Sequence, residues 1–292
     1  MSAKSRSTVY LFVTALIWGV AFVAQRVGAD FVGPFTFNAA RFALGGLSLV
    51  PVALFFEHGD EVRTRRRRTW LAGLLGGLVL FLASYLQQLG IALTGLAGKS
   101  AFITGLYIVL VPILGIFLGR KPRISVWLGA VLACGGLYLL SAPEGLGSVG
   151  WGDAVLLLGA FFWAVHIILV DRFARDVNPI RFSLLQFLIC AALSGLCAFA
   201  FEEITLAGLT AAAGPILYAG LLSVGVAYTL QIFGQRHVEP GKAAIVFSLE
   251  AVFSALGAAI LIGEFMTPRG YVGSLCILAG ILLSQITPRR EQ

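Results

Sequence analysis

The sequence predicts an all-α integral membrane protein whose ten transmembrane helices form two inverted five-helix repeats. The first observation is composition: 59% of the 292 residues are hydrophobic and 12% are charged, whereas soluble domains carry about 25% charged residues. The second is segmentation, because apolar stretches of about 20 residues, enough to cross a bilayer as a helix, follow one another along the chain. The third is an internal repeat. Together they predict a single membrane domain over residues 1–292.

Ten spans are expected in chain order, with Pro or Gly at several of the breaks between them. Lys4 and Arg6 precede the first apolar stretch as in a signal peptide, but no small-residue cleavage site follows and further spans come after. We therefore interpret this stretch as the first span. The breaks Gly33-Pro34 and Asn178-Pro179 fit helix starts, because the fixed φ of Pro suits a first turn. The predicted spans are 8–27, 34–56, 70–92, 98–118, 124–141, 151–171, 179–200, 213–234, 241–262 and 269–287.

The two halves of the chain share residues at offsets of 143 to 145. We predict a first repeat over residues 1–145 and a second over residues 146–292. Because each repeat holds five spans, an odd number, the second starts from the opposite side of the membrane, and a pseudo-two-fold axis in the membrane plane relates the two. The matches are Trp18 and Pro34 with Trp163 and Pro179, then Tyr85, Gln88, Gly98, Lys99 and Ala101 with Tyr228, Gln231, Gly241, Lys242 and Ala244, and then Trp127, Gly129 and Gly136 with Tyr271, Gly273 and Gly280.

Basic residues gather on one side of the predicted topology. With loops assigned alternately to the two sides, 17 of the 21 Lys and Arg residues lie on the side of the N-terminus, and three, Arg26, Lys99 and Arg269, lie on the other. This asymmetry is the positive-inside pattern, which places the basic side in the cytoplasm. We therefore expect a multi-pass protein of the inner cell membrane with both termini cytoplasmic, which requires an even number of spans.

The net charge of +7 follows from this topology and does not indicate nucleic-acid binding. The run Arg65–Arg68 lies in a short loop beside anionic lipid headgroups. Gly98-Lys99-Ser100 resembles the end of a phosphate-binding loop, but Leu93 stands where that motif needs Gly, which argues against an ATPase. Lys99 and its repeat partner Lys242 are interpreted either as interfacial lysines that snorkel or as residues at the mouths of a transport pathway.

No cofactor, metal site or catalytic residue is predicted. The four cysteines lie within apolar stretches and form no CxxC pair, as expected of small buried residues. The three histidines are too dispersed for a metal site. Motifs of metalloproteases, serine hydrolases and dinucleotide-binding enzymes are absent.

Two polar pairs at helical spacing are candidates for a transport site. Tyr85 and Gln88 are three residues apart and share one helical face, and Tyr228 and Gln231 repeat this pattern in the second half. The inverted repeat places the two pairs on opposite sides of the membrane midplane. Gln in hydrocarbon is costly without partners, so these residues are expected either to line a cavity or to hydrogen-bond to neighbouring helices.

Aromatic residues near the middle of spans are candidates for the wall of a substrate cavity. Trp18 and Trp163 lie away from the headgroup belt in which Trp usually anchors helices, and Phe22, Phe102 and Tyr107 extend the set. The alternative interpretation of these aromatic residues is ordinary packing between helices.

Arg41, His166 and Glu250 are ionisable residues within predicted spans, and such residues are functional hypotheses by default. His166 shares a face with Trp163 and is expected to bind substrate, to titrate near neutral pH or to form a structural hydrogen bond. Glu250 is expected to take up a coupling proton, to pair with a substrate amino group or to have a structural partner. Arg41 lies near the outer end of its span, where we expect a structural ion pair or a headgroup contact.

Four segments carry a resemblance to a known family: Ala15–Gly19, Ala40–Gly45, Ala101–Pro112, and Ser248–Phe253 followed by Leu261–Glu264. They resemble EamA-type members of the drug/metabolite transporter superfamily, and the overall pattern is similar to amino-acid exporters of the YddG type. The resemblance covers both halves of the chain and implies ten helices in two inverted repeats, no ATPase, and a central cavity lined by helices 1, 3, 4, 6, 8 and 9. Ala251 stands where many members have Pro, so this chain lacks the usual cause of a kink in helix 9.

The resemblance implies a secondary transporter that exports aromatic and other neutral amino acids and related metabolites by alternating access. The alternatives are export of hydrophobic or cationic drugs or of another small metabolite, and, in a different class, an intramembrane lipid-handling protein or enzyme. The expected partners are a small-molecule substrate and the lipid bilayer, and a monomer is expected because the duplication supplies an internal interface. The implied substrate-binding residues are Trp18, Phe22, Tyr85, Gln88, Thr104, Tyr107, Trp163, His166, Tyr228, Gln231, Ser248 and Glu250.

Overall fold

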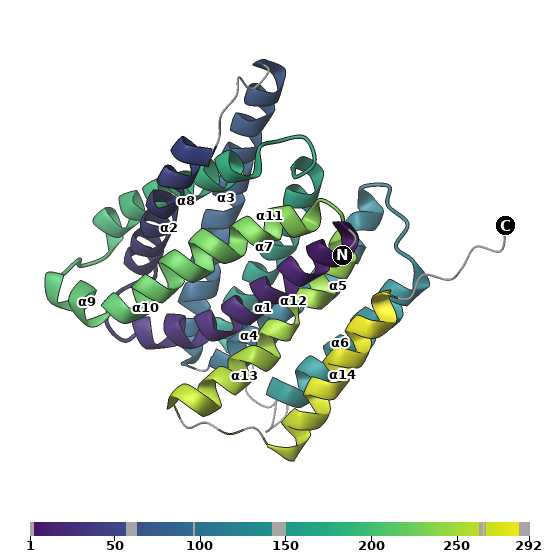
Figure 1. The fold of residues 1–292 in the computed structure, drawn as a ribbon. Helices are drawn as coiled ribbons and strands as arrows, with labels where there is room; N and C mark the ends of the chain where they lie inside the picture. The colour runs from purple at the N-terminus through teal and green to yellow at the C-terminus, as the bar shows by residue number, and fades with distance from the viewer. Residues whose placement is uncertain are drawn as a thin grey trace.

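A computed structural model describes residues 3–56, 63–95, 97–141, 150–262, 265 and 267–285. Within these residues the chain forms helices joined by short connections, and no strand (Figure 1). Four residues that the sequence analysis uses, His58, Glu264, Arg289 and Arg290, lie outside the described residues.

The helices follow the predicted spans in chain order. Asn178 caps the start of α8, where its Oδ1 accepts hydrogen bonds from the amides of Ile180 and Arg181, and Thr205 caps the short connecting helix α9 in the same way. The elements are α1 (Ala3–Gly28), α2 (Pro34–Phe56), α3 (Arg63–Thr94), α4 (Ala97–Gly105), α5 (Tyr107–Phe117), α6 (Ile124–Ser141), α7 (Trp151–Phe173), α8 (Pro179–Phe201), α9 (Leu206–Ala211), α10 (Ala213–Leu217), η1 (Tyr218–Tyr228), α11 (Thr229–Gln235), α12 (Pro240–Phe247), α13 (Leu249–Ile262) and α14 (Pro268–Gln285).

The helical segments have the length and composition of a membrane protein. Within the described residues, eight of them are long and apolar enough to cross a bilayer. Two shorter apolar helices, Ile124–Leu139 and Pro268–Ser284, lie at the fifth and tenth predicted spans. The all-helical membrane fold is therefore confirmed, while the number of ten spans stays a prediction.

Two of the predicted spans are interrupted near their middles. In the first, α4 ends at Gly105 and α5 begins at Tyr107. The amide of Leu106 bonds to the carbonyl of Ile103 at 3.2 Å, three residues back, which tightens the chain at this point as in a 3₁₀ turn. The interruption lies upstream of Pro112. The missing N–H of Pro112 weakens the start of α5, the helix that follows the interruption.

The second interruption, between α12 and α13, falls at Ser248. The sequence lacks the usual cause of a kink here, because Ala251 stands in place of Pro. Ser248 Oγ donates a hydrogen bond to the carbonyl oxygen of Ile245 at 2.7 Å, and such back-bonding by serine bends helices. A serine hydroxyl therefore accompanies the interruption in a helix that has Ala251 in place of Pro.

The eighth predicted span changes helical type along its length. α10 continues into the π-helical turns of η1 and then into α11. Such turns are rare and are frequent at functional sites. Side chains of α1 bond to carbonyl oxygens of η1: Thr14 Oγ1 donates to Ala227 at 3.1 Å, and Trp18 Nε1 donates to Ser223 at 3.4 Å. α1 and η1 are thereby joined beside the centre of the bundle.

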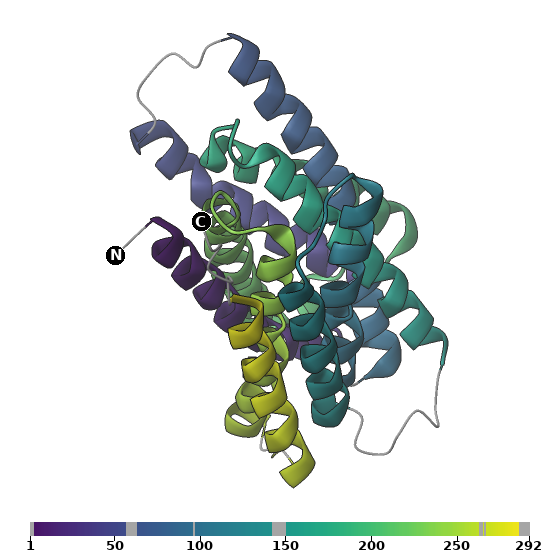
Figure 2. The ribbon, with the colours of Figure 1, turned by 90° about the vertical axis from the view of Figure 1, so that its right-hand side faces the viewer.

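α6 and α14 form a pair at the edge of the bundle, on the right in Figure 1 and at the front of Figure 2. Their backbones meet at glycines. A Cβ atom on Gly129 would lie 2.7 Å from the carbonyl oxygen of Gly280, and one on Gly136 would lie 2.6 Å from that of Gly273. Because Gly129 matches Gly273 and Gly136 matches Gly280 in the repeat, each glycine contacts the partner of the other.

The loops rich in basic residues meet at one end of the bundle, which we call the basic end. Arg120 forms an ion pair with Asp171 at 2.6 Å, and Arg68 forms one with Asp176 at 3.4 Å. The Arg236 guanidinium donates to the carbonyl of Ala174 at 2.7 Å. These contacts join the ends of α3, α5, α7 and α11, as the alternating assignment of loops predicts.

The opposite end of the bundle has its own polar contacts. Lys99 at the start of α4 pairs with Asp153 at the start of α7 at 2.8 Å. The Glu202 carboxylate, just after α8, accepts hydrogen bonds from the amides of Phe35 and Thr36, each at 2.8 Å. This carboxylate satisfies free amides at the start of α2 and interacts favourably with the positive end of that helix.

We expect Gly136→Val to destabilise the protein because the new side chain has to occupy the backbone contact between α6 and α14. Overpacking of this kind costs about 1–3 kcal/mol, measured as a lower melting temperature in detergent. Gly135→Val is the matched control, since a Cβ atom there has no neighbour within 4 Å and the change in helix propensity is the same. Equal melting temperatures for the two variants would contradict the contact.

Candidate functional site

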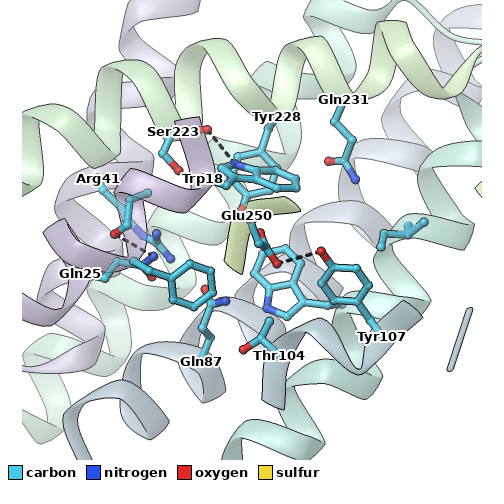
Figure 3. A pocket seen from close by; sticks show the side chains of 14 residues that line it. Trp18, Gln25, Arg41, Gln87, Thr104, Tyr107, Ser223, Tyr228, Gln231 and Glu250 are labelled. Carbon is cyan, nitrogen blue, oxygen red and sulfur yellow. Dashed lines mark hydrogen bonds between the residues drawn. The ribbon is translucent and has the colours of Figure 1, made fainter. Parts of the chain in front are cut away.

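A cavity lies at the centre of the bundle, where helices from both halves of the chain meet (Figure 3). Its volume is about 30 Å³, which holds about two water molecules. An amino acid therefore does not fit in this conformation, and a substrate site here requires the helices to separate. The lining residues are Trp18, Ala21, Phe22, Gln25, Arg41, Gln87, Thr104, Tyr107, Trp163, Ile167, Ser223, Tyr228, Gln231 and Glu250.

The cavity brings together eight of the twelve residues that the sequence analysis proposes for substrate binding. Their role in binding stays a prediction. They come from α1, α4, α5, α7, η1, α11 and α13 and are Trp18, Phe22, Thr104, Tyr107, Trp163, Tyr228, Gln231 and Glu250.

Aromatic rings form one wall of the cavity. The ring centroid of Trp18 lies 4.7 Å from that of Tyr228 and 6.5 Å from that of Trp163, its repeat partner. Trp163 and Tyr228 are stacked, with centroids 6.0 Å apart and planes 19° apart. Phe247 packs behind Trp18 at 5.2 Å. Ring pairs at these distances attract one another by more than the burial of their apolar surface alone provides. These contacts hold the wall together.

Tyr107 and Glu250 join the two interrupted spans. The phenol of Tyr107 donates a hydrogen bond to Glu250 Oε1 at 2.8 Å. Tyr107 is the first residue of α5 and Glu250 lies in the first turn of α13, and the two positions match in the repeat at the offset of 143. Gly19 brings α1 against this turn, since a Cβ atom there would lie 2.7 Å from the Glu250 carbonyl oxygen.

Arg41, which the sequence analysis did not propose for the site, faces the same cavity. Its expected headgroup contact was wrong, because only 1% of the residue is exposed. Its Nε donates a hydrogen bond to Asn38 Oδ1 at 2.8 Å, and no acidic residue among the described ones pairs with it. The position near the start of α2 suggested an interfacial residue, whereas the packing of α2 directs this side chain inward.

Several polar atoms around the cavity lack a hydrogen-bond partner among the described residues. Both amide atoms of Gln231 are in this state, as are Gln25 Oε1, Thr104 Oγ1 and Trp163 Nε1. Buried polar groups are normally hydrogen-bonded, because leaving one unpaired costs about 1–3 kcal/mol. These atoms belong to residues that line one cavity, and polar groups that converge on a cavity are the pattern expected of a binding site for a polar ligand.

Four of the proposed residues lie outside the cavity lining. Tyr85 stacks on Phe35 with ring centroids 4.0 Å apart, toward the end of the bundle that Glu202 occupies. Gln88 Nε2 donates to the carbonyl oxygen of Gln25 at 3.0 Å. Ser248 bonds to the backbone of its own helix. Tyr85 and Tyr228 match in the repeat and were both candidates for the transport site, but the structure places only Tyr228 at the cavity.

His166 is the fourth of these residues. It is fully buried behind the aromatic wall, with its ring edge-on to Trp163 and Tyr228. One ring nitrogen, Nε2, lies 3.0 Å from Gln186 Oε1. This partner fits the structural hydrogen bond that the sequence analysis left open beside a role in binding.

Sequence reasoning missed Gln25 and Gln87 as well as Arg41. Gln25 stands seven residues after Trp18, two helical turns along the same face of α1, and this spacing could have identified it. Gln87 and Gln88 are neighbours in sequence and differ in direction by about 100° around α3, so the sequence alone did not distinguish which one faces the cavity.

A second, larger cavity of about 360 Å³ lies at the basic end between α5 and the start of α12. Val111, one turn after Tyr107 on α5, contributes to its lining, together with Arg120, Arg123 and Glu239. One helical turn of α5 therefore separates this cavity from the central one. Lys242 is buried near it, with 4% exposed, whereas Lys99 pairs with Asp153 at the opposite end.

Comparisons with known proteins identify a transporter fold. The sequence profile of the EamA-like transporter family matches residues 6–142 and again residues 150–285. An uncharacterized transporter of Archaeoglobus fulgidus is 28% identical over 281 residues, which is 94% of this chain and 83% of that one. The threonine/homoserine exporter RhtA of Escherichia coli K12 is 27% identical over 293 residues, which is 97% of this chain and 92% of that one.

A crystal structure of another protein has the same fold. It aligns with a TM-score of 0.78 at 20% sequence identity and covers 96% of this chain and 96% of its own. At this identity the likeness describes the arrangement of the helices and carries nothing about the ligand.

We expect the Tyr107–Glu250 hydrogen bond to appear as a coupling in a double-mutant cycle. Tyr107→Phe removes the donor and Glu250→Leu removes the acceptor of a buried bond to an ionisable group, so the two effects on unfolding should differ from additivity by about 1–3 kcal/mol. The measurement is the stability of both single variants and the double variant in detergent. Tyr107→Phe combined with Glu203→Leu, at an exposed loop residue, is the control and should be additive. Additivity in the first cycle would show that the bond contributes nothing.

Proposed function

The chain belongs to the EamA-like transporter family, and we propose that it is a secondary transporter that exports aromatic and other neutral amino acids and related metabolites. Because the family and the relatives above are transporters, it is not an enzyme. The observation that carries the proposal is the central cavity, where an aromatic wall faces charged and amide groups. Aromatic rings suit an apolar side chain, and the polar groups suit the α-amino and carboxylate groups. The relative named as a threonine/homoserine exporter supports this substrate class.

We propose that transport proceeds by alternating access between two inverted five-helix repeats, residues 1–145 and 146–292, with ten spans in all. One half-bundle would rock against the other about the central cavity, as inverted repeats allow. The Tyr107–Glu250 hydrogen bond joins the interrupted helices of the two repeats. Its rupture would widen the central cavity and connect it with the larger cavity at the basic end, one helical turn away.

The basic end is proposed to face the cytoplasm, with both termini on that side of the inner membrane. The support is the asymmetry of Lys and Arg between the two ends, since the positive-inside rule sets the orientation of short loops. We propose a monomer as the transporting unit, because the two repeats supply the interface that two separate subunits would otherwise form.

Export of hydrophobic or cationic drugs is the second candidate function. It is favoured by Glu250, a buried carboxyl group at the aromatic wall for which the described residues supply no cationic partner. A ligand with a positive charge and apolar body would satisfy both features. The two candidates differ in whether a substrate carboxylate is needed.

The first test is uptake of a panel of labelled amino acids into liposomes that contain the purified protein. We expect flux of phenylalanine, threonine and other neutral amino acids well above that of empty liposomes, since their side chains and zwitterionic ends match the cavity. Trp18→Ala, which removes the ring at the centre of the wall, should reduce this flux, whereas Trp151→Ala, at an exposed Trp, should not. Uptake of a labelled hydrophobic cation with no amino-acid flux would instead favour drug export.

We propose Glu250 as the group that takes up a coupling proton. Tyr107, Tyr228 and Arg41 are the other charged or titratable residues lining its cavity, and His166 lies behind the wall. A gradient of one pH unit, acidic inside the liposomes, should support about tenfold accumulation of substrate if one proton leaves per substrate that enters. Glu250→Gln should abolish this accumulation.

The control for this experiment is Glu203→Gln, the same chemical change at an exposed carboxylate. It should accumulate substrate like the wild type. Full accumulation by Glu250→Gln would exclude Glu250 as the coupling residue. Flux that ignores the gradient in the wild type would identify a facilitator.

A further inference from the structure

Arg41 is a buried cation at the edge of the central cavity. It lies two helical turns into α2, and 1% of the residue is exposed. Nη2 of its guanidinium has no hydrogen-bond partner among the described residues, and no carboxylate there pairs with it. A charge inside a membrane protein is costly unless it is paired or faces a water-filled cavity. Arg41 is therefore best explained by a partner that arrives through the cavity.

The guanidinium group is held in a fixed position. Asn38, one turn earlier on α2, accepts the bond from Nε at 2.8 Å. The rings of Phe42 and Phe37 lie 4.8 and 5.7 Å from the guanidinium carbon, distances at which an aromatic ring attracts a cation. Asn38 thus binds Nε and the two rings cover the face of the guanidinium, while Nη2 stays available to donate a hydrogen bond. A guanidinium fixed in this way is prepared for a planar anion such as a carboxylate.

Glu250 supplies a carboxyl group in the same cavity. Figure 3 shows Arg41 at the left of the pocket, Glu250 in the middle and Tyr107 to its right. The structure records no ion pair between Arg41 and Glu250, and the partner of Glu250 is the neutral phenol of Tyr107. One cavity thus contains a guanidinium and a carboxyl group that do not pair with each other.

We propose that Arg41 binds the carboxylate of the substrate while Glu250 faces its ammonium group, so that the site selects zwitterions. This inference rests on the proposed function and narrows it. A zwitterion offers a carboxylate to the Arg41 guanidinium and an ammonium group to the Glu250 carboxyl group. A hydrophobic cation leaves Arg41 unpaired, and a simple carboxylic acid leaves Glu250 unpaired, and each unpaired buried charge weakens binding.

The unpaired amides extend the same site. Gln231 has both amide atoms without partners, and Gln25 Oε1 is also free of a partner within the described residues. These groups donate and accept hydrogen bonds to the polar end of a ligand. Trp18, Phe22 and Trp163 provide the apolar surface for its side chain. The ammonium group of a substrate would replace Tyr107 as the partner of Glu250, which links binding to separation of α5 from α13.

The decisive experiment compares matched ligands on the wild-type protein in liposomes. The readout is inhibition of labelled phenylalanine uptake by unlabelled phenylalanine, phenylalaninamide and 3-phenylpropionate. The amide lacks the carboxylate and the acid lacks the ammonium group, but both keep the ring. We expect each analogue to inhibit on the order of 10- to 100-fold more weakly than phenylalanine, the effect of losing a hydrogen bond to a charged group. Equal inhibition by phenylalanine and its amide would overturn the assignment of Arg41.

Variants locate the effect at Arg41. Arg41→Gln should lose phenylalanine affinity on the order of 10- to 100-fold while its affinity for phenylalaninamide changes little, so the preference for phenylalanine over phenylalaninamide disappears. Arg172→Gln, at a side chain 71% exposed on α7, is the matched control and should keep the preference. A preference for phenylalanine over phenylalaninamide that survives Arg41→Gln in folded protein would overturn the proposal.

Failure of the inference and failure of the proposed function give different results. Flux of amino acids with no preference over their amides removes the role of Arg41 and leaves amino-acid export standing. A wild type that transports no amino acid removes the proposed function and this inference with it. Size-exclusion elution and the melting temperature of Arg41→Gln check its folding, and if it does not fold, the comparison of ligands on the wild type decides the question alone.

Discussion

Hydrocarbon offers no hydrogen bonds, so every polar group in this bundle needs a partner from the protein itself. At the two ends, Glu202 caps α2, Asp153 pairs with Lys99, and Asp171 pairs with Arg120. At the central cavity, both amide atoms of Gln231 and one guanidinium nitrogen of Arg41 have no partner among the described residues. Other buried polar atoms, Asp153 Oδ1 and Ser194 Oγ among them, also have none. The unpaired groups therefore mark the site only together with the cavity that they line.

The two repeats meet through matching positions, and the differences between those positions carry the chemistry. Gly129 and Gly136 contact the repeat partners of each other on α14, so the symmetric positions there keep the same residue type. Tyr107 and Glu250 also match in the repeat, but one is a neutral donor and the other a carboxyl group, and they bond to each other. Two identical carboxyl groups at these positions would repel when ionised. Because Tyr107 is a neutral donor and Glu250 an acceptor, the matching positions form an asymmetric bond.

The sequence predicted the helical membrane fold well because the hydrophobic segments and the helix starts are local signals. It predicted the site less completely because residue type does not fix the direction of a side chain. Tyr85 and Tyr228 match in the repeat, but Tyr85 stacks on Phe35 and Tyr228 stacks on Trp163 at the cavity. Arg41 was expected to form an ion pair or a headgroup contact from its place near the start of α2, whereas the structure holds it inward against Phe37, Phe42 and Asn38. The interruption at Ser248 was missed because a serine bends a helix only when its hydroxyl bonds to the backbone.

A small cavity lined by a guanidinium and a carboxyl group has consequences for affinity under the proposed function. The cavity holds about two water molecules, so in the proposed transport cycle binding would break the Tyr107–Glu250 bond and move the helices apart. Part of the interaction energy between the proposed substrate and Arg41 and Glu250 would then be spent on opening the site, and the net affinity would be lower than two charge pairs give on their own. Weak net binding would favour release on the other side of the membrane, while the need to satisfy both groups would preserve selection for the class of ligand. The proposed exporter would gain from this combination, because it would move substrate only when the cytoplasmic pool is high and still reject ligands that carry one charge.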